Sequence, residues 1–188
     1  MSGTTFQEIE HKFVVDAAFD AAAFDAACLA MQPPVEKALA VRDTYYVLQN
    51  RADVVLRHRL DAEIQQLTLK TREADPEVRV EVNLALDNTT DQTAAIHTLL
   101  SHLGVEATYH IHKDIRVFEF PDCEVVRYRA THGERVVHCV EFEAVGADSI
   151  ADALAILARY ELALGFDASQ RASANLLDLL VPNNPIST

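Results

Sequence analysis

The chain has 188 residues, a length that favours one compact domain, with a core at about residues 6–181 and a tail at 182–188. Hydrophobic residues make up 49% of the chain and charged residues 24%, which excludes a disordered protein. The 16 Lys and Arg residues against 29 Asp and Glu give a net charge of −13, which argues against a nucleic-acid-binding protein, because such a protein shows a basic stripe.

The sequence shows no signal for a membrane or for secretion. No apolar run approaches the ~20 residues that a membrane-spanning helix needs, and the N-terminus is not built like a signal peptide. We therefore expect a cytoplasmic protein without a membrane partner. The cysteines (Cys28, Cys123 and Cys139) lack C-x-x-C spacing, so we expect reduced, mostly buried thiols rather than zinc ligands.

Period-two alternation of apolar and polar residues predicts strands in most of the first two-thirds of the chain. The first half is predicted to contain one helix, at Ala17–Met31, among five strands at Phe6–Val15, Arg42–Gln49, Val54–Leu60, Gln66–Arg72 and Val78–Leu86. The second half is predicted to contain strands at Tyr109–Phe120, Glu124–Ala130 and Arg135–Val145, and helices at about Asp91–Leu103, Ser149–Leu164 and Ala168–Val181.

Asp16 is predicted to cap the first helix, and Pro33-Pro34 are predicted to end it. The short connections between the strands favour antiparallel neighbours. We therefore predict an α+β protein built on a large antiparallel sheet or a closed barrel.

The polar faces of the predicted strands are charged. Side chains two residues apart on a strand point the same way. The sets that share a face are Glu8, Glu10 and Lys12; Arg57 and Arg59; Lys70 and Arg72; Arg79, Glu81 and Asn83; Arg127 and Arg129; Glu141 and Glu143. Lys113 and Arg116 are three residues apart, so they share a face only if a bulge intervenes.

Each of these sets, taken alone, is explained by ion pairs on a solvated face. If the sheet closes, however, the charged faces converge on one lumen, and so much charge of both signs would be destabilising in a dry interior. We infer a wet cavity for a ligand that carries charges of both signs, such as a polyphosphate with its divalent cation. Carboxylates suit Mg²⁺ or Mn²⁺, and Arg and Lys suit phosphate oxygens.

The sequence resembles the CYTH superfamily, the triphosphate tunnel metalloenzymes. Glu8-Ile9-Glu10-His11-Lys12 is similar to the ExExK motif that opens the family. The segments that resemble later family strands follow in the family's order: Asp43-Thr44-Tyr45-Tyr46, Leu56-Arg57-His58-Arg59, Leu67-Thr68-Leu69-Lys70, Arg79-Val80-Glu81 and Val140-Glu141-Phe142-Glu143. The segment from Arg171 to Leu180 is similar to the family's C-terminal helix.

This resemblance implies a closed eight-stranded antiparallel β-barrel, with helices packed on the outside, that binds triphosphates with Mg²⁺ or Mn²⁺. The implied metal ligands are Glu8, Glu10, Glu141 and Glu143, with Glu81 serving either the metal or the orientation of a basic neighbour. The implied phosphate-binding residues are Lys12, Arg57, Arg59, Lys70, Arg79, Lys113 and Arg116. The expected catalytic group is Glu10, Glu143 and Lys12, with Glu10 or Glu143 orienting the attacking water.

The seventh predicted strand departs from the family. The family commonly places an Asp there as a further metal ligand, whereas this strand reads Val125-Val126-Arg127-Tyr128-Arg129-Ala130. The added positive charge of Arg127 and Arg129 would favour anion binding over metal capture. The missing Asp bears on whether a second metal ion binds and on the rate of hydrolysis.

The leading hypothesis is metal-dependent hydrolysis of a linear triphosphate, such as tripolyphosphate, thiamine triphosphate or a nucleoside triphosphate. One alternative is a class IV adenylate cyclase. That branch has a His-Phe element several residues before ExExK, and here only residues 1–7 precede the motif. A second alternative is a non-catalytic module that binds polyphosphate or a nucleotide. The sequence leaves a homodimer open.

Overall fold

The computed structural model describes residues 4–49, 51, 53–71 and 78–182, with the side chains of 4–8, 78 and 79 excepted. Within these ranges the strands are β1 (Thr4–Val15), β2 (Val35–Leu48), β3 (Val54–Leu60), β4 (Gln65–Thr71), β5 (Val78–Leu86), β6 (Val105–Glu119), β7 (Cys123–His132) and β8 (Arg135–Ala144). The helices are α1 (Ala21–Ala30), α2 (Thr93–His102), α3 (Ile150–Ala163), the 3₁₀ turn η1 (Ala168–Gln170) and α4 (Leu176–Leu180). None of these helices combines the length and apolar character that crossing a membrane needs.

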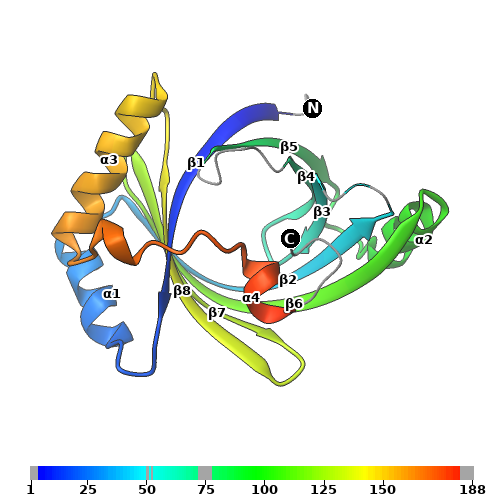
Figure 1. The fold of residues 1–188 in the computed structure, drawn as a ribbon, viewed down its shortest axis with the longest axis horizontal. Helices are drawn as coiled ribbons and strands as arrows, with labels where there is room; N and C mark the ends of the chain where they lie inside the picture. Colours follow the sequence, from blue (N-terminus) through cyan, green and yellow to red (C-terminus); the bar gives the residue numbers. More distant parts are fainter. Residues whose placement is uncertain (1–3, 50, 52, 72–77, 183–188) are drawn as a thin grey trace.

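The strands form one antiparallel sheet in the order β1-β5-β4-β3-β2-β6-β7-β8. Strand β1 has a partner on each side: its first half, Thr4–Ile9, pairs with β5, and its second half, Glu10–Val15, pairs with β8. The sheet therefore curls on itself around an interior, as Figure 1 shows. The prediction of an α+β protein with an eight-stranded antiparallel sheet is confirmed at this level.

Apolar residues on the outer face of the sheet pack against helices. One core cluster joins β1, β6, β7 and β8 to α1 and α3, and its largest members are Phe13, Phe24, Phe118, Phe142, Leu157 and Tyr160. A smaller cluster joins Tyr46 of β2 to Ile96 and Leu100 of α2. Because successive side chains alternate across a strand, these outward apolar residues direct the intervening residues into the interior.

Helix α4 packs inside the curled sheet rather than outside it. Its nearly buried side chains are Leu176, Leu177 and Leu180. They cluster with Val41 of β2 and Ile115 of β6. The preceding segment is fastened to β1, where the Ala172 amide donates a 2.7 Å hydrogen bond to the Lys12 carbonyl. In Figure 1 this segment runs from α3 across the opening of the curled sheet.

Two helix predictions need correction. The cap of α1 is Asp20 rather than Asp16, because the Asp20 carboxylate accepts hydrogen bonds from the amides of Ala22 and Ala23. The single helix expected over Ala168–Val181 is divided into η1 and α4. The backbone is extended at Arg171, and the Asn175 side chain accepts from the Asp178 amide to start a new helix.

Strand β2 begins earlier than the sequence pattern predicted. It starts at Val35 instead of Arg42, because its first half pairs along β6, from Val35 opposite Glu119 to Val41 opposite Lys113. This half is largely exposed and contains alanines, so its alternation is weak. The long β2–β6 pair matters for the site because it brings Lys113 beside the charged residues of β2 and β3.

Candidate functional site

The curled sheet encloses a cavity of about 1050 Å³, which we call the lumen. Alternate residues of all eight strands line it, together with residues 173–178 at α4. The basic side chains among its lining residues are Lys12, Lys37, Arg57, Arg59, Lys70 and Lys113. The acidic side chains from the strands are Glu10, Glu81, Glu119, Glu124, Glu141 and Glu143. The predicted convergence of charged strand faces on one cavity is therefore observed for these residues, except that Lys37, Glu119 and Glu124 were not among those predicted.

Asp43 forms the centre of a first charged group, on β2, β3 and β6. Its carboxylate accepts two hydrogen bonds from Arg59, at 2.9 and 3.0 Å, and lies 2.8 Å from the Lys113 ammonium. Burial alone would raise the pKa of Asp43, but the charges of Arg59 and Lys113 outweigh burial and hold this pKa well below its usual range. One ionised acid thus faces two cations, so we call this group the Asp43 triad, with a net charge of +1.

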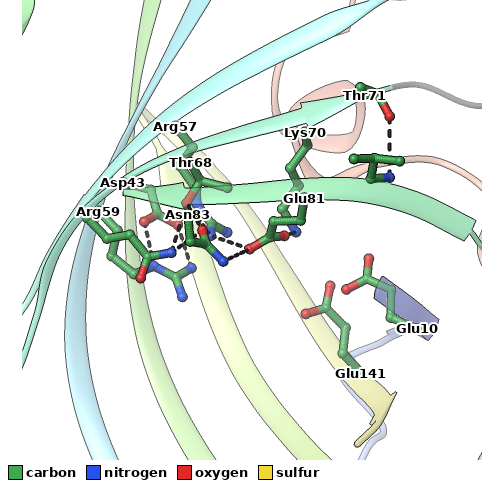
Figure 2. A network of polar contacts seen from close by, with 12 residues as sticks. Glu10, Asp43, Arg57, Arg59, Thr68, Lys70, Thr71, Glu81, Asn83 and Glu141 are labelled. Carbon is green, nitrogen blue, oxygen red and sulfur yellow. Dashed lines mark hydrogen bonds and ion pairs between the residues drawn. The ribbon is translucent and has the colours of Figure 1, made fainter. Parts of the chain in front are cut away.

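Glu81 forms the centre of a second group, on β3, β4 and β5. Lys70 lies directly opposite Glu81 across the β4–β5 pair, with its ammonium 2.6 Å from one carboxylate oxygen. The Arg57 guanidinium is 4.0 Å from the other oxygen, and Asn83 donates a 2.7 Å hydrogen bond to that oxygen. Burial opposes ionisation, yet Lys70 and Arg57 lower the pKa of Glu81 to about 2. This Glu81 triad also has a net charge of +1 (Figure 2).

The opposite wall, formed by β1 and β8, is acidic. Glu10 of β1 lies directly opposite Glu143 of β8, and Lys12 lies opposite Glu141. The Lys12 ammonium is 3.1 Å from the Glu141 carboxylate and 3.7 Å from that of Glu10. Tyr128 of β7 donates a 2.7 Å hydrogen bond to the same Glu141 oxygen. Figure 2 shows Glu10 and Glu141 pointing into the lumen across from the Glu81 triad.

Two further acidic residues, on β6 and β7, extend this wall and were not predicted from the sequence. In the strand registers, Glu119 of β6 lies opposite Glu124 of β7, Glu124 lies opposite Glu143, and Glu143 lies opposite Glu10. Four carboxylates thus form one row across four adjacent strands. Burial, and then the neighbouring Glu119, raise the pKa of Glu124. Like charges directly opposite one another destabilise a sheet. Lys37 lies 3.0 Å from Glu119 at one end of the row, and the carboxylates toward β8 and β1 favour a bound cation.

The seventh strand is therefore acidic toward the lumen, contrary to the sequence prediction. Glu124 faces inward with Tyr128. Arg127 lies on the outer face, where it makes two hydrogen bonds to Asp25 of α1, at 2.7 and 2.6 Å. Arg129 is exposed beside Asp114. The two arginines do not add charge to the lumen.

Arg116 is also outside the lumen, so its expected place beside Lys113 is wrong. The β6–β7 register runs without a shift from Glu119 to His112, and without a bulge two residues three apart face opposite ways. Arg116 instead pairs with Glu36 and lies 3.7 Å from Asp25. It helps to fasten α1 to the outside of the sheet.

Two predicted site residues have side chains outside the described part of the structure. These are Glu8 and Arg79, whose backbones lie directly opposite each other in the β1–β5 pair. Their predicted roles in metal and phosphate binding stay predictions.

The acidic wall fits a divalent metal ion by its chemistry. Glu10, Glu141 and Glu143 offer the oxygen ligands that Mg²⁺ and Mn²⁺ prefer. Among the described residues, no three His, Cys, Asp or Glu side chains are already gathered as a metal site. The Lys12 ammonium lies close to Glu10 and Glu141 and acts as their counter-ion. A divalent ion would therefore take over a position that already attracts a cation.

No family model matches the chain, and no curated protein sequence matches it. Solved structures do match. The PH1012 protein of Pyrococcus horikoshii aligns with a TM-score of 0.75 at 17% identity, covering 92% of this chain and 99% of that chain. A Bacillus halodurans protein described as a "putative adenylate cyclase" aligns with a TM-score of 0.63 at 15% identity, covering 93% and 97%. A chain of the Schizosaccharomyces pombe Mediator head module aligns with a TM-score of 0.61 at 16% identity, covering 85% and 95%.

These similarities establish a shared fold. The Bacillus halodurans protein has the same fold over 93% of this chain. The same fold also occurs in a chain of the Mediator head module, so the fold alone does not give a reaction. Function is therefore inferred from the charges in the lumen.

Proposed function

We propose that the protein hydrolyses a linear triphosphate in its lumen with the help of Mg²⁺ or Mn²⁺, the curled sheet acting as a closed tunnel around the substrate. The separation of charge in the lumen carries this proposal. Two triads with a net charge of +1 each, centred on Asp43 and Glu81, face an acidic wall on β1 and β8. A polyphosphate with a divalent cation carries charges of both signs and complements both sides.

The triads define which cations reach the phosphates. Arg59 makes a two-point contact with Asp43, so it contributes mainly charge and holds the position of that carboxylate. Lys113, Lys70 and Arg57 each make one ion pair with the acid of their triad, and they would contact phosphate oxygens in the lumen. Glu81 lies with these cations and orients them; it is not part of the metal-binding wall.

The metal ion would be held by Glu10, Glu141 and Glu143. When bound, it supplies positive charge to phosphate oxygens as the reaction develops negative charge there. Because the metal ion would then neutralise Glu10 and Glu141, Lys12 would be able to pair with a phosphate oxygen instead. Glu10 or Glu143 would accept a proton from the attacking water. The water oxygen forms a bond to the terminal phosphorus, the bridging P–O bond breaks, and diphosphate leaves.

Substitution of lumen residues tests this function. Glu10→Gln and Arg57→Ala each remove one charged contact, which typically costs ~10²–10³ in rate. The matched control is Arg127→Ala, which removes an arginine that is paired with Asp25 on the outer face. We expect phosphate release from a triphosphate with Mn²⁺ to fall in the first two variants, both of which stay folded at the assay temperature, and to persist in the control. Full activity of Glu10→Gln or Arg57→Ala would show the site assignment to be wrong.

The description of the Bacillus halodurans neighbour favours cyclisation of ATP as a second candidate. The same assay separates the two reactions, because a cyclase releases pyrophosphate and cyclic AMP instead of phosphate. Arg127 and Arg129 favoured a non-catalytic binding module when the sequence alone was considered. Their side chains point away from the lumen, so they do not support such a module. Tripolyphosphate binding that survives EDTA, without turnover, would nevertheless establish such a module.

A further inference from the structure

Tyr128 lies between the acidic wall and the Asp43 triad. It is 2% exposed and faces the lumen from the middle of β7. Its hydroxyl donates a 2.7 Å hydrogen bond to Glu141, and the Lys113 ammonium lies 5.3 Å from the centre of its ring. One buried side chain thus contacts a candidate metal ligand by its hydroxyl and a candidate phosphate-binding cation by its ring face.

The hydroxyl fixes the Glu141 carboxylate. The Glu141 oxygen that accepts from Tyr128 is also the one that lies 3.1 Å from the Lys12 ammonium. If Lys12 moves toward a phosphate, the hydrogen bond from Tyr128 remains on that oxygen. A ligand carboxylate that keeps such a hydrogen bond is held in orientation for a metal ion.

The ring face fixes Lys113. This ammonium lies 2.8 Å from Asp43 on one side and over the Tyr128 ring on the other. A cation over an aromatic face is attracted by the negative charge of the π system, most strongly where water is excluded. Lys113 is 7% exposed, so the ring is part of its desolvated surroundings.

We propose that Tyr128 is a positioning residue for the proposed reaction, holding Glu141 for the metal ion through its hydroxyl and Lys113 for the phosphates through its ring. This inference rests on the proposed function. It predicts that the two contacts can be removed one at a time. Tyr128→Phe keeps the ring and removes the hydroxyl, whereas Tyr128→Leu removes both.

The first measurement is binding of Mn²⁺ alone, by calorimetric titration. Loss of a hydrogen-bonding partner of a metal ligand typically costs ~10–100-fold in metal affinity, and we expect a loss at the lower end, ~10-fold, for Tyr128→Phe. Binding of tripolyphosphate in EDTA should be unchanged in this variant, because Lys113 keeps its aromatic partner. In kinetics, the Mn²⁺ concentration needed for half-maximal rate should rise, with the rate at saturating Mn²⁺ close to that of the wild type.

Tyr128→Leu should weaken both Mn²⁺ binding and tripolyphosphate binding. The matched control is Tyr160→Phe. Tyr160 of α3 is also buried and donates a 2.9 Å hydrogen bond to a carboxylate, that of Asp122. It packs against the outer face of the sheet, away from the lumen. Loss of that bond should change stability alone and leave both affinities as in the wild type.

The outcomes separate this inference from the proposed function. If the wild type hydrolyses triphosphate and Tyr128→Phe binds Mn²⁺ as tightly as the wild type, the positioning role is wrong and the function stands. Equal loss of Mn²⁺ affinity in Tyr160→Phe would also overturn the positioning role, because the effect would then be general. If the wild type neither binds Mn²⁺ nor turns over any triphosphate, both proposals fail.

Discussion

Glu81 and Asp43 are the residues that allow a folded acidic protein to keep cations in its interior. Each carboxylate is buried, and each is ionised because two cations surround it. Without these acids, the cations of the lumen would repel one another inside the sheet. With them, each triad retains one surplus positive charge that an anion can neutralise.

Substitution of Glu81 should produce a stability difference that depends on pH. The pKa of Glu81 is lowered to about 2 from its usual 4.5, so its ionised form stabilises the fold above pH ~4.5, and this contribution disappears as pH falls toward 2. We expect Glu81→Gln to be less stable than the wild type at pH 6, with a gap that closes as pH falls from ~4.5 toward 2. Urea unfolding at several pH values measures the gap.

The control for this series is Asp114→Asn, which changes an exposed carboxylate beside Arg129 on the outer face. It should track the wild type at every pH, because exposed pairs contribute little to stability. A gap for Glu81→Gln that stays constant or widens toward acid would contradict the ionised triad.

Among the elements, α4 has a dual role. Its leucines fill the apolar end of the lumen, and the residues that lead into it complete the lining. Leu177 is 2% exposed, whereas Leu162 of α3 is 80% exposed, so the two leucines form a matched pair for mutation. Because α4 is only five residues long, packing rather than helix propensity holds it in place.

Leu177→Ala should therefore lower the free energy of unfolding by about 2–5 kcal/mol, the usual range for a buried leucine. Leu162→Ala should stay within ~0.5 kcal/mol of the wild type. Chemical unfolding of the three proteins measures both differences. Similar small effects in the two variants would mean that α4 is not packed in the lumen as described.

For strand β7, the sequence pattern did not predict which face points into the lumen. Alternation predicted that Lys12 and Arg57 lie on the charged faces of their strands, and the expected closure of the sheet turned those faces inward, in agreement with the positions of both residues in the lining of the lumen. Both faces of β7 mix charged and apolar residues, so the pattern does not say which side is inward. The decisive contact joins Arg127 to Asp25, which is 102 residues away, and only the folded chain brings the two together.

At the scale of the whole molecule, the chain has a net charge of −13, yet positive and negative side chains occupy separate walls of the lumen. Positive triads face an acidic wall across one cavity, and helices shield the outer face of the same strands. Order of motifs along the sequence was enough to predict an eight-stranded antiparallel sheet. The four-glutamate row from Glu119 to Glu10 depends on the register of four strands, which the sequence alone does not fix.

We propose that the lumen holds a triphosphate and a divalent ion on opposite walls. The most direct measurement is a crystal structure with Mn²⁺ and tripolyphosphate, in which anomalous scattering locates the metal. We predict a Mn²⁺ peak at the carboxylates of Glu10, Glu141 and Glu143, with phosphates contacting Lys70 and Lys113. A Mn²⁺ peak confined to the outer face, or an anion bound away from the two triads, would contradict the account.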